Sequence, residues 1–291
     1  MTQGLLEATP AATIVRFRCT VPQRYRCTRQ ARGRQGVQIH AGSIAPGDTV
    51  LVAGATGGVG QILTAKLLER GYKVRAMTRS REKASQLLGE KEGLEVIVAD
   101  AKDPQSLSAA VQGITAVAAV TGTTAFPSKK WTGNNGPEQT DLIAMRNLIE
   151  ATPKSVKRFV LTTSAGVDRS NKIPFSILNL FGVLKFKKQA EMLLQESGLP
   201  WTILRPSRLT DGPYTSFDLN TLLQATAGTR QDVQISMQDD QLGEASRIAV
   251  AEAIVQLLAI DAAEGRKYSI ASKEGDGPGT DPAKWKALLG V

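Results

Sequence analysis

Apolar residues show two alternating spacing patterns along most of this 291-residue chain. From residue 49 onward, short runs rich in β-branched residues alternate with longer runs that show helical spacing. This alternation is typical of βαβ units and predicts an α/β fold with a Rossmann-type, doubly wound parallel sheet. We expect strands at residues 49–53, 73–78, 95–99, 116–120, 158–162, 201–204 and 267–270. We expect helices at residues 59–70, 82–88, 104–111, 138–151, 175–196 and 247–260.

One segment interrupts the alternation. Residues 207–243 are rich in Thr, Gly, Asp and Gln, and we interpret them as a small C-terminal substrate lobe of helix and short strand. Ligands of open α/β sheets bind beyond the carboxyl ends of the strands, so this lobe is expected to form the far wall of a cleft. Its candidate ligand contacts are Asp211, Tyr214 and Asp218. Residues 43–291 as a whole are predicted to form one Rossmann domain.

The positive charge is concentrated near the beginning of the chain. The formal net charge is +9, but residues 1–40 hold seven Arg, no Lys and one acid, which leaves only +3 for the remainder. A segment that is rich in Arg, poor in acids and without an apolar run matches an organelle transit peptide. We therefore predict that residues 1–42 are a disordered transit peptide, processed near residues 40–43. A disordered basic tail that binds RNA or acidic lipid is the alternative.

The same segment holds every cysteine and histidine. Cys19, Cys27 and His40 all lie there, so a processed protein has no disulfide, no cysteine nucleophile, no Ser-His-Asp triad and no Cys/His metal site. We therefore expect no metal. The apolar runs are shorter than the ~18 residues that cross a bilayer, so we expect at most peripheral membrane association.

A glycine-rich loop connects the first predicted strand to the first helix. Its spacing is GxxGxxG, set by Gly54, Gly57 and Gly60. Glycines permit a tight turn and a close approach of a pyrophosphate to the free amides of a helix N-terminus. We predict a dinucleotide site rather than an ordinary tight turn, because both flanking elements are present. The loop residues expected to bind it are Gly54, Ala55, Thr56, Gly57, Gly58, Val59 and Gly60.

The end of the second strand indicates which dinucleotide binds. NAD-preferring proteins place an acid there for the ribose 2′-hydroxyl, whereas this chain has Arg79, followed by Arg81. A guanidinium suits a 2′-phosphate, so NADP(H) is favoured over NAD(H). The alternative is that both arginines belong to a solvated helix start. Asp100 and Ala101 follow the third strand and Thr121 the fourth, and we expect all three to contact the cofactor.

Together these motifs resemble the atypical short-chain dehydrogenase/reductase superfamily, in the NmrA-like, plastid NAD(P)-binding branch that includes Tic62-like proteins. The resemblance covers about residues 48–291 and implies a location in the chloroplast stroma. Besides the glycine loop, it is carried by the segments at residues 121–127, 159–166, 187–191, 202–206 and 277–281, and by Trp285.

The resemblance also assigns catalytic positions. Active members use a Ser together with a Tyr and a Lys spaced YxxxK, in which the Tyr exchanges a proton while hydride leaves or reaches the nicotinamide. Ser164 stands at the position of the Ser and Lys187 at that of the Lys, but position 183 is Val. The usual proton donor is therefore missing, although Lys187 can still bind the nicotinamide ribose. The alternative for Lys187 is a solvated lysine within a basic run.

Three further features leave alternatives open. The apolar segment at residues 175–184 is either a membrane-surface or partner-binding face, or a buried central helix or dimer seam. Asp141 and Asn147 either line the cofactor cleft or belong to an exposed polar face. Arg205 is a candidate for a salt bridge beneath the lobe.

Two functional classes follow from these residues. The first is a catalytically weak NADP(H)-binding protein of the chloroplast that acts as a redox sensor or as an assembly or scaffold factor. The second is an NADP(H)-dependent oxidoreductase that transfers hydride to a small or pigment-like substrate. The missing Tyr favours the first class, while the presence of Ser164 and Lys187 is consistent with the second class. The expected partners are a nicotinamide dinucleotide and a plastid protein, not DNA, and the expected state is a monomer or a homodimer.

Overall fold

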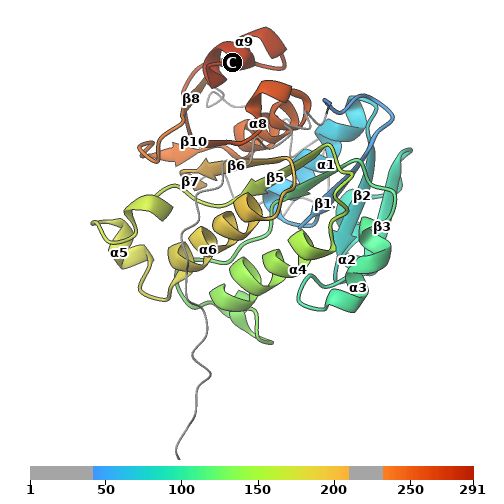
Figure 1. Cartoon of the computed structure of the whole chain (residues 1–291), viewed down its shortest axis with the longest axis horizontal. Coiled ribbons are helices and arrows are strands. Elements are labelled where there is room, and N and C mark those ends of the chain that lie inside the picture. Colours follow the sequence, from blue (N-terminus) through green and yellow to red (C-terminus); the bar gives the residue numbers. More distant parts are fainter. Residues whose placement is uncertain (1–41, 210–231) are drawn as a thin grey trace, which may run out of the picture. The chain divides into compact units, whose positions relative to one another are not determined.

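An eight-stranded sheet forms the centre of the computed structural model, which describes residues 42–209 and 232–291 (Figure 1). The strand order is β3-β2-β1-β4-β5-β6-β10-β8, in which every neighbouring pair is parallel except β10 and β8. The first six positions have the Rossmann order, which confirms the predicted fold class. The sheet strands are β1 (Thr49–Ala53), β2 (Lys73–Thr78), β3 (Leu94–Val98), β4 (Ala116–Ala119), β5 (Arg158–Thr162), β6 (Trp201–Pro206), β8 (Asp232–Ser236) and β10 (Arg266–Lys273).

Helices connect the strands and cover both faces of the sheet. They are α1 (Gly58–Glu69), α2 (Arg81–Leu88), α3 (Pro104–Val111), α4 (Ala144–Ala151), α5 (Phe175–Leu178), α6 (Val183–Glu196), α8 (Arg247–Ala259) and α9 (Pro282–Leu289). Short turns add η1 (Lys129–Trp131), η2 (Glu138–Ile143), η3 (Val167–Arg169) and η4 (Asp261–Ala263). Local signals start several helices: Ser80 caps α2, and Asp103 and Asp281 cap α3 and α9, each followed by Pro at the first helical position.

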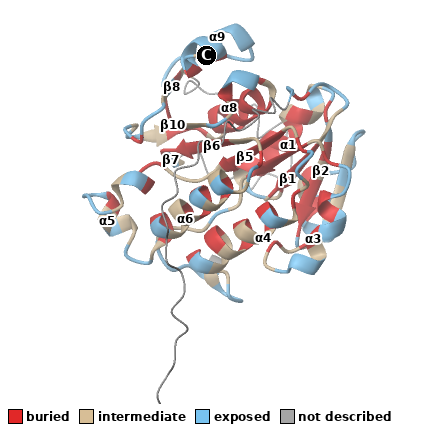
Figure 2. Cartoon of the chain, viewed as in Figure 1, coloured by how far each residue is buried: buried red, intermediate tan, exposed pale blue. Residues whose placement is uncertain are grey.

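Alternate residues of the strands pack into two separate cores. Val50 and Val52 of β1 face the layer of α1 and α8, while Leu51 and Ala53 face the layer of α3, α4 and α6. All four side chains are buried, because a parallel sheet covered on both faces leaves no solvated side. Figure 2 shows this arrangement as a buried sheet between helices whose outer sides are exposed. The loops that follow the parallel strands therefore lie along the carboxyl edge of a sheet that is packed on both faces.

Two predicted helices differ from those observed. The expected helix at residues 175–196 is broken between α5 and α6, where Gly182 has a φ of +78° and lies so close to the Phe186 ring that a Cβ would be 2.9 Å from it. The expected helix at residues 138–151 begins as the π-helical turn η2 and becomes α-helical only at Ala144. Hydrophobic periodicity does not distinguish these local changes of winding.

The segment predicted as a lobe is divided in the structure. Its residues 210–231, which include Asp211, Tyr214 and Asp218, lie outside the described residues. Residues 232–236 are not in a separate lobe strand but form β8 at the sheet edge, where Val233 joins the core of α1 and α8. Short strands β7 (Arg208–Leu209) and β9 (Glu244–Ala245) pair with each other on either side of the undescribed part.

Helix α9 was not among the predicted elements. The N-cap Asp281 and Pro282 at the first helical position are a recognisable start signal. Trp285 of this helix is buried, and its indole nitrogen donates to the carbonyl of Gly279 at 2.9 Å. The C-terminal segment is therefore part of the core of the domain.

Candidate functional site

The glycine loop has no room for side chains at two of the three glycines that form its GxxGxxG spacing. Gly54 has a φ of +94°, and a Cβ there would lie 2.8 Å from the methyl group of Thr121. A Cβ on Gly60 would lie 2.1 Å from the carbonyl oxygen of Gly54, inside the backbone of the loop itself. The strand, the turn and the helix are therefore closer together than any other residue type would allow.

The N-terminus of α1 is arranged to receive an anion. Its N-cap is Gly57, which supplies no side-chain hydrogen bond, and its first turn holds no acidic residue. Ala55 and Val59 point into the core, so the loop offers backbone groups rather than side chains. The amide of Gly57 donates to the carbonyl of Gly54 at 2.9 Å and thereby holds the turn closed. The first amides of a helix have no acceptor within it, and together with the positive end of the helix dipole they suit the pyrophosphate of a dinucleotide.

Two cations meet beyond the end of β2. The exposed Arg79 donates from Nη1 to Oδ1 of Asn135 at 2.8 Å, and Nζ of Lys102 donates to the same oxygen at 2.9 Å. In the described residues no acid forms an ion pair with Arg79, whereas Lys102 has Asp100 at 3.8 Å. Sequence reasoning missed Lys102 and Asn135. Lys102 was visible as a base two residues after Asp100, but the approach of Asn135 depends on how the loop after β4 folds.

Hydrogen bonds from α4 hold the turn after β3 in place. Asn147 of α4 donates from its amide to the carbonyls of Ala101 and Lys102, at 3.0 and 3.2 Å. Asp100 accepts from the amide of Lys102 at 3.0 Å, and Asp103 caps α3. Asn147 thus stabilises the turn that holds Asp100 and Ala101, which were expected to contact the cofactor.

A buried ion pair lies beside the end of β4. Nζ of Lys187 on α6 is 2.6 Å from Oδ1 of Asp141 in η2, and their side chains are 8% and 1% exposed. Thr123 donates to the same carboxylate through both its amide and its hydroxyl. A Cβ on Gly122 would lie 2.8 Å from Lys187 Nζ, so the ammonium lies directly under the loop. The alternatives of a solvated Lys187 and an exposed Asp141 are therefore wrong.

The other catalytic positions are not linked to this pair. The hydroxyl of Ser164 donates to the carbonyl of Ala165 at 3.1 Å, and no hydrogen bond within the described residues connects it to Lys187. Val183, at the position of the missing Tyr, is buried against Phe175 and Leu184. The site thus holds a buried ammonium and a hydroxyl, but no phenol at that position.

A second ionic network lies under the loop after β5. Arg205 of β6 makes two hydrogen bonds to Glu191, at 3.0 and 2.6 Å, and one to Asp168 at 2.5 Å. Lys188 also pairs with Asp168. Burial by itself would raise the pKa of Asp168, but hydrogen bonds and charges from Lys188 and Arg205 outweigh it and lower that pKa. The predicted salt bridge of Arg205 is confirmed, and it joins α6 to the loop of Asp168.

Asp239 joins the end of β8 to the same loop, which the sequence did not indicate. Its carboxylate accepts from the amides of Gly166 and Asp168 at 2.7 and 2.9 Å and lies 3.8 Å from Arg169. Gly166 has a φ of +91°, and a Cβ there would overlap the ring of Phe175. The loop that carries Ser164 is therefore constrained by distant parts of the chain.

The apolar segment at residues 175–184 is only partly buried. Phe175, Val183 and Leu184 are buried, whereas Ile177, Leu180 and Phe181 are between 45% and 70% exposed. The Phe181 ring packs edge-on against Phe126 and Trp131 from the loop after β4. The alternative of a buried central helix is therefore wrong for this segment, because the chain is not helical between α5 and α6 and these three large apolar side chains are exposed.

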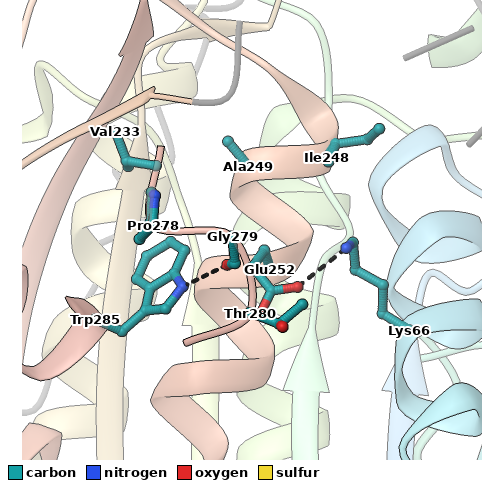
Figure 3. A pocket seen from close by; sticks show the side chains of 9 residues that line it. All are labelled: Lys66, Val233, Ile248, Ala249, Glu252, Pro278, Gly279, Thr280 and Trp285. Atoms are coloured by element: carbon teal, nitrogen blue, oxygen red, sulfur yellow. Dashed lines mark hydrogen bonds and ion pairs between the residues drawn. The ribbon is translucent and has the colours of Figure 1, made fainter. Parts of the chain in front are cut away.

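A small pocket of about 70 Å³ lies elsewhere, between α1, α8 and the C-terminal segment (Figure 3). At its base, Glu252 pairs with Lys66 at 3.0 Å and with Arg70 at 2.7 Å, and Trp285 closes another side. None of the expected cofactor residues lines it. The described residues contain no group of three His, Cys, Asp or Glu that could hold a metal ion. Their helices include none that is long and apolar enough to cross a membrane.

Sequence comparison finds relatives of this chain among plant proteins. A chloroplastic, uncharacterized protein of Arabidopsis thaliana is 31% identical over 88% of this chain and 79% of its own length. Sanguinarine reductase of Eschscholzia californica is 31% identical over 83% of this chain and 94% of its own. Protein TIC 62 of Arabidopsis thaliana, also chloroplastic, is 34% identical over 62% of this chain, but the match spans only 30% of that longer relative.

Solved structures show the same fold. The oxidoreductase ylbE of Lactococcus lactis superposes with a TM-score of 0.63 at 21% identity, covering 83% of this chain and 95% of its own. ChuY, an anaerobillin reductase of Escherichia coli O157:H7, superposes with a TM-score of 0.59 at 26% identity, covering 76% and 96%. The NAD(P)H-binding family model matches residues 54–261, from the first glycine of the loop to the end of α8 and beyond. The chain belongs to this NAD(P)H-binding family, within the atypical short-chain dehydrogenase/reductase group of Rossmann-fold proteins.

Proposed function

We propose that this protein binds NADP(H) in preference to NAD(H), with the pyrophosphate at the glycine loop and the 2′-phosphate at Arg79. Two features together carry the proposal. Gly60 leaves no space for a Cβ in the glycine loop. Arg79 has, within the described structure, a neutral amide as its only hydrogen-bond acceptor. A guanidinium without a carboxylate partner is available for a phosphate. An acid at this position would instead favour the 2′-hydroxyl of NAD(H).

The proposed role is that of a chloroplast redox sensor or of an assembly or scaffold factor that responds to NADP(H). Val183 cannot donate a proton, and the ammonium of Lys187 is engaged by Asp141 at 2.6 Å. A positioned general acid contributes about 10²–10⁴-fold to a rate, so its loss leaves binding intact while weakening the reaction. The similarity to the chloroplastic protein TIC 62 supports the chloroplast location for the shared domain alone, because the match covers 30% of that protein.

Equilibrium titration tests the cofactor assignment. NADPH and NADH are titrated into the purified chain, and we expect NADPH to bind more tightly. Arg79→Asp should abolish the difference by opposing the 2′-phosphate, while Lys91→Asp, which reverses the charge of an exposed lysine in the turn between α2 and β3, should retain it. An unchanged NADPH/NADH affinity ratio in Arg79→Asp would show that the assignment is wrong.

A second candidate is an NADP(H)-dependent oxidoreductase acting on a small or pigment-like substrate. It is favoured by the retention of Ser164 and by the match to sanguinarine reductase along 94% of that enzyme. Oxidation of bound NADPH is measured with a panel of carbonyl, iminium and enone compounds. Turnover that disappears in Ser164→Ala would support this candidate, and tight binding without turnover would support the sensor or assembly role.

We also propose that residues 1–42 direct the chain to the chloroplast stroma. The composition of this segment and the chloroplastic names of related proteins support the assignment. Import of the full chain into isolated chloroplasts, followed by sequencing of the mature N-terminus, tests it. Failure to enter the organelle, or entry without shortening, would contradict it.

A further inference from the structure

Lys102 and Arg79 converge on a single neutral atom. They donate to Oδ1 of Asn135 at 2.9 and 2.8 Å, so their nitrogen atoms are no farther apart than the sum of these distances. Two like charges this close repel each other unless an anion lies between them. An amide oxygen carries only a partial negative charge and cannot neutralise both.

The surrounding charges do not remove the imbalance. Among the described acids, Asp100 alone pairs with either cation, and its carboxylate is 3.8 Å from Lys102 and 37% exposed. The remaining contacts of the Lys102 ammonium are the carbonyls of Gly133 and Asn134, at 3.5 and 3.4 Å. The cluster therefore combines two cations, one partly solvated acid and several neutral acceptors. With Asp100 paired to Lys102 only at 3.8 Å, both cations remain available to donate to an anion.

A phosphomonoester has the required charge and shape. It carries about −1.5 to −2 at neutral pH and presents three acceptor oxygens. Arg79 can bind two of them through its planar fork, and Lys102 can bind the third as a point charge. Arg79 directly follows β2 and Lys102 lies in the turn after β3, so the pairing of these two parallel strands brings both residues to the same edge of the sheet.

We propose that Lys102 is the second cation of a phosphomonoester subsite and that Oδ1 of Asn135 stands where a phosphate oxygen binds. This inference rests on the proposed function, since the phosphomonoester is the 2′-phosphate of NADP(H). The phosphate displaces the Asn135 amide and takes over both of its donors. Lys102 thus determines dinucleotide specificity from a position outside both the glycine loop and the end of β2.

Titration with NADPH, NADH and 2′,5′-ADP tests the role of Lys102. Lys102→Gln should weaken NADPH and 2′,5′-ADP by about tenfold or more, the effect of losing one charge-assisted hydrogen bond, and change NADH by less than about twofold. Lys102→Arg should restore most of the loss, and Lys91→Gln should have no selective effect. Equal weakening of NADPH and NADH binding would mean that Lys102 only holds the loop of Asn134. Unchanged NADPH binding would mean that Lys102 does not contact the ligand. Either result overturns the inference.

Asn135→Asp tests the position of the phosphate. The new carboxylate would neutralise both cations and compete with the ligand, so NADPH and 2′,5′-ADP should weaken by at least about tenfold while NADH is little changed. Unchanged NADPH affinity would overturn the inference. If the unaltered protein binds neither dinucleotide, the proposed function fails as well. If Lys102→Gln keeps the full NADPH preference, the inference about Lys102 alone fails.

Discussion

The ammonium of Lys187 and the carboxylate of Asp141 form an ion pair of 2.6 Å between α6 and the π-helical turn η2, with both side chains buried. Thr123 adds two hydrogen bonds to the carboxylate from the loop after β4. The pair therefore joins three chain segments at the edge of the sheet where Rossmann proteins bind their ligands. Local π-helical winding is frequent at functional sites, and here it contains the residue that holds the lysine.

Breaking this pair should destabilise the domain. Asp141→Asn leaves a buried ammonium without its counter-charge, which costs about 3–5 kcal/mol of unfolding free energy. Urea denaturation monitored by circular dichroism measures the change. Lys188→Gln is the control, because its side chain is 32% exposed and its ion pair with Asp168 is worth about 1 kcal/mol or less. Equal losses of unfolding free energy in the two variants would show that the buried ion pair stabilises the domain no more than the exposed one.

A methyl group at Gly60 should disrupt the dinucleotide loop. The Cβ of Gly60→Ala would lie 2.1 Å from the carbonyl oxygen of Gly54, and only a shift of the backbone relieves this overlap. We expect loss of NADPH binding together with a lower melting temperature. Gly42→Ala, at an exposed position with no heavy atom within 4 Å of the added Cβ, should change neither property. Normal NADPH affinity in Gly60→Ala would contradict the assignment of the loop.

Glu252 should contribute to the pH dependence of stability. Burial alone would raise the pKa of Glu252, but Gln256, Lys66 and Arg70 outweigh it and hold the pKa below the ordinary value of 4.5. A pKa that is lower in the folded than in the unfolded state stabilises the fold above about pH 4.5 and loses this effect as pH falls through the folded pKa.

Glu252→Gln tests this contribution. The substitution leaves Lys66 and Arg70 without a charged partner, so we expect a loss of about 3–5 kcal/mol at pH 7. The difference from the unaltered protein should become smaller as the pH falls from about 4.5 through the lower pKa of the folded state, where the natural carboxyl becomes protonated as well. Urea unfolding at several pH values measures both effects. A difference that stays constant with pH would contradict ionisation of Glu252 in the folded state.

Trp285 should be a main anchor of the C-terminal segment. Its side chain is buried at the pocket of Figure 3, so Trp285→Ala is expected to cost about 3–5 kcal/mol of unfolding free energy. Trp285→Phe keeps an aromatic ring but loses the donor to Gly279, and we expect a smaller cost of about 1–2 kcal/mol. Thermal melting of both variants gives the order. Equal stability of Trp285→Ala and the natural chain would show that α9 does not stabilise the domain.

Much of the fold could be predicted because its signals are local. The alternation of β-branched and amphipathic runs identified β1, β2 and β5 with their observed bounds. Caps such as Asp103 were also readable, since they depend on a residue and its next three neighbours. The break before α6 was not predicted, because Gly182 interrupts the helix by its positive φ while apolar periodicity continues across it.

The candidate site shows the same division. The glycine loop could be recognised because its geometry is formed by consecutive residues, whereas Lys102 and Asn135 are 33 positions apart and meet only through the folded loop after β4. Lys187 was singled out by its place in a motif, but its burial and its partner Asp141 were not foreseen. Asp239 was not singled out at all, because its two amide donors lie more than 70 positions earlier in the chain.

From its sequence alone, this protein is an α/β chain with a Rossmann order of elements, a dinucleotide loop at the first crossover and Val in place of the usual Tyr. Those properties depend on short-range periodicity, on glycine's freedom of conformation and on residue identity. Only the tertiary structure decided that Lys187 is buried against Asp141, that Arg205 joins α6 to the loop of Asp168, and that two cations meet at Asn135. Electrostatic contacts act between groups brought together by packing, and the distance between two charges in space is not encoded in their separation along the chain.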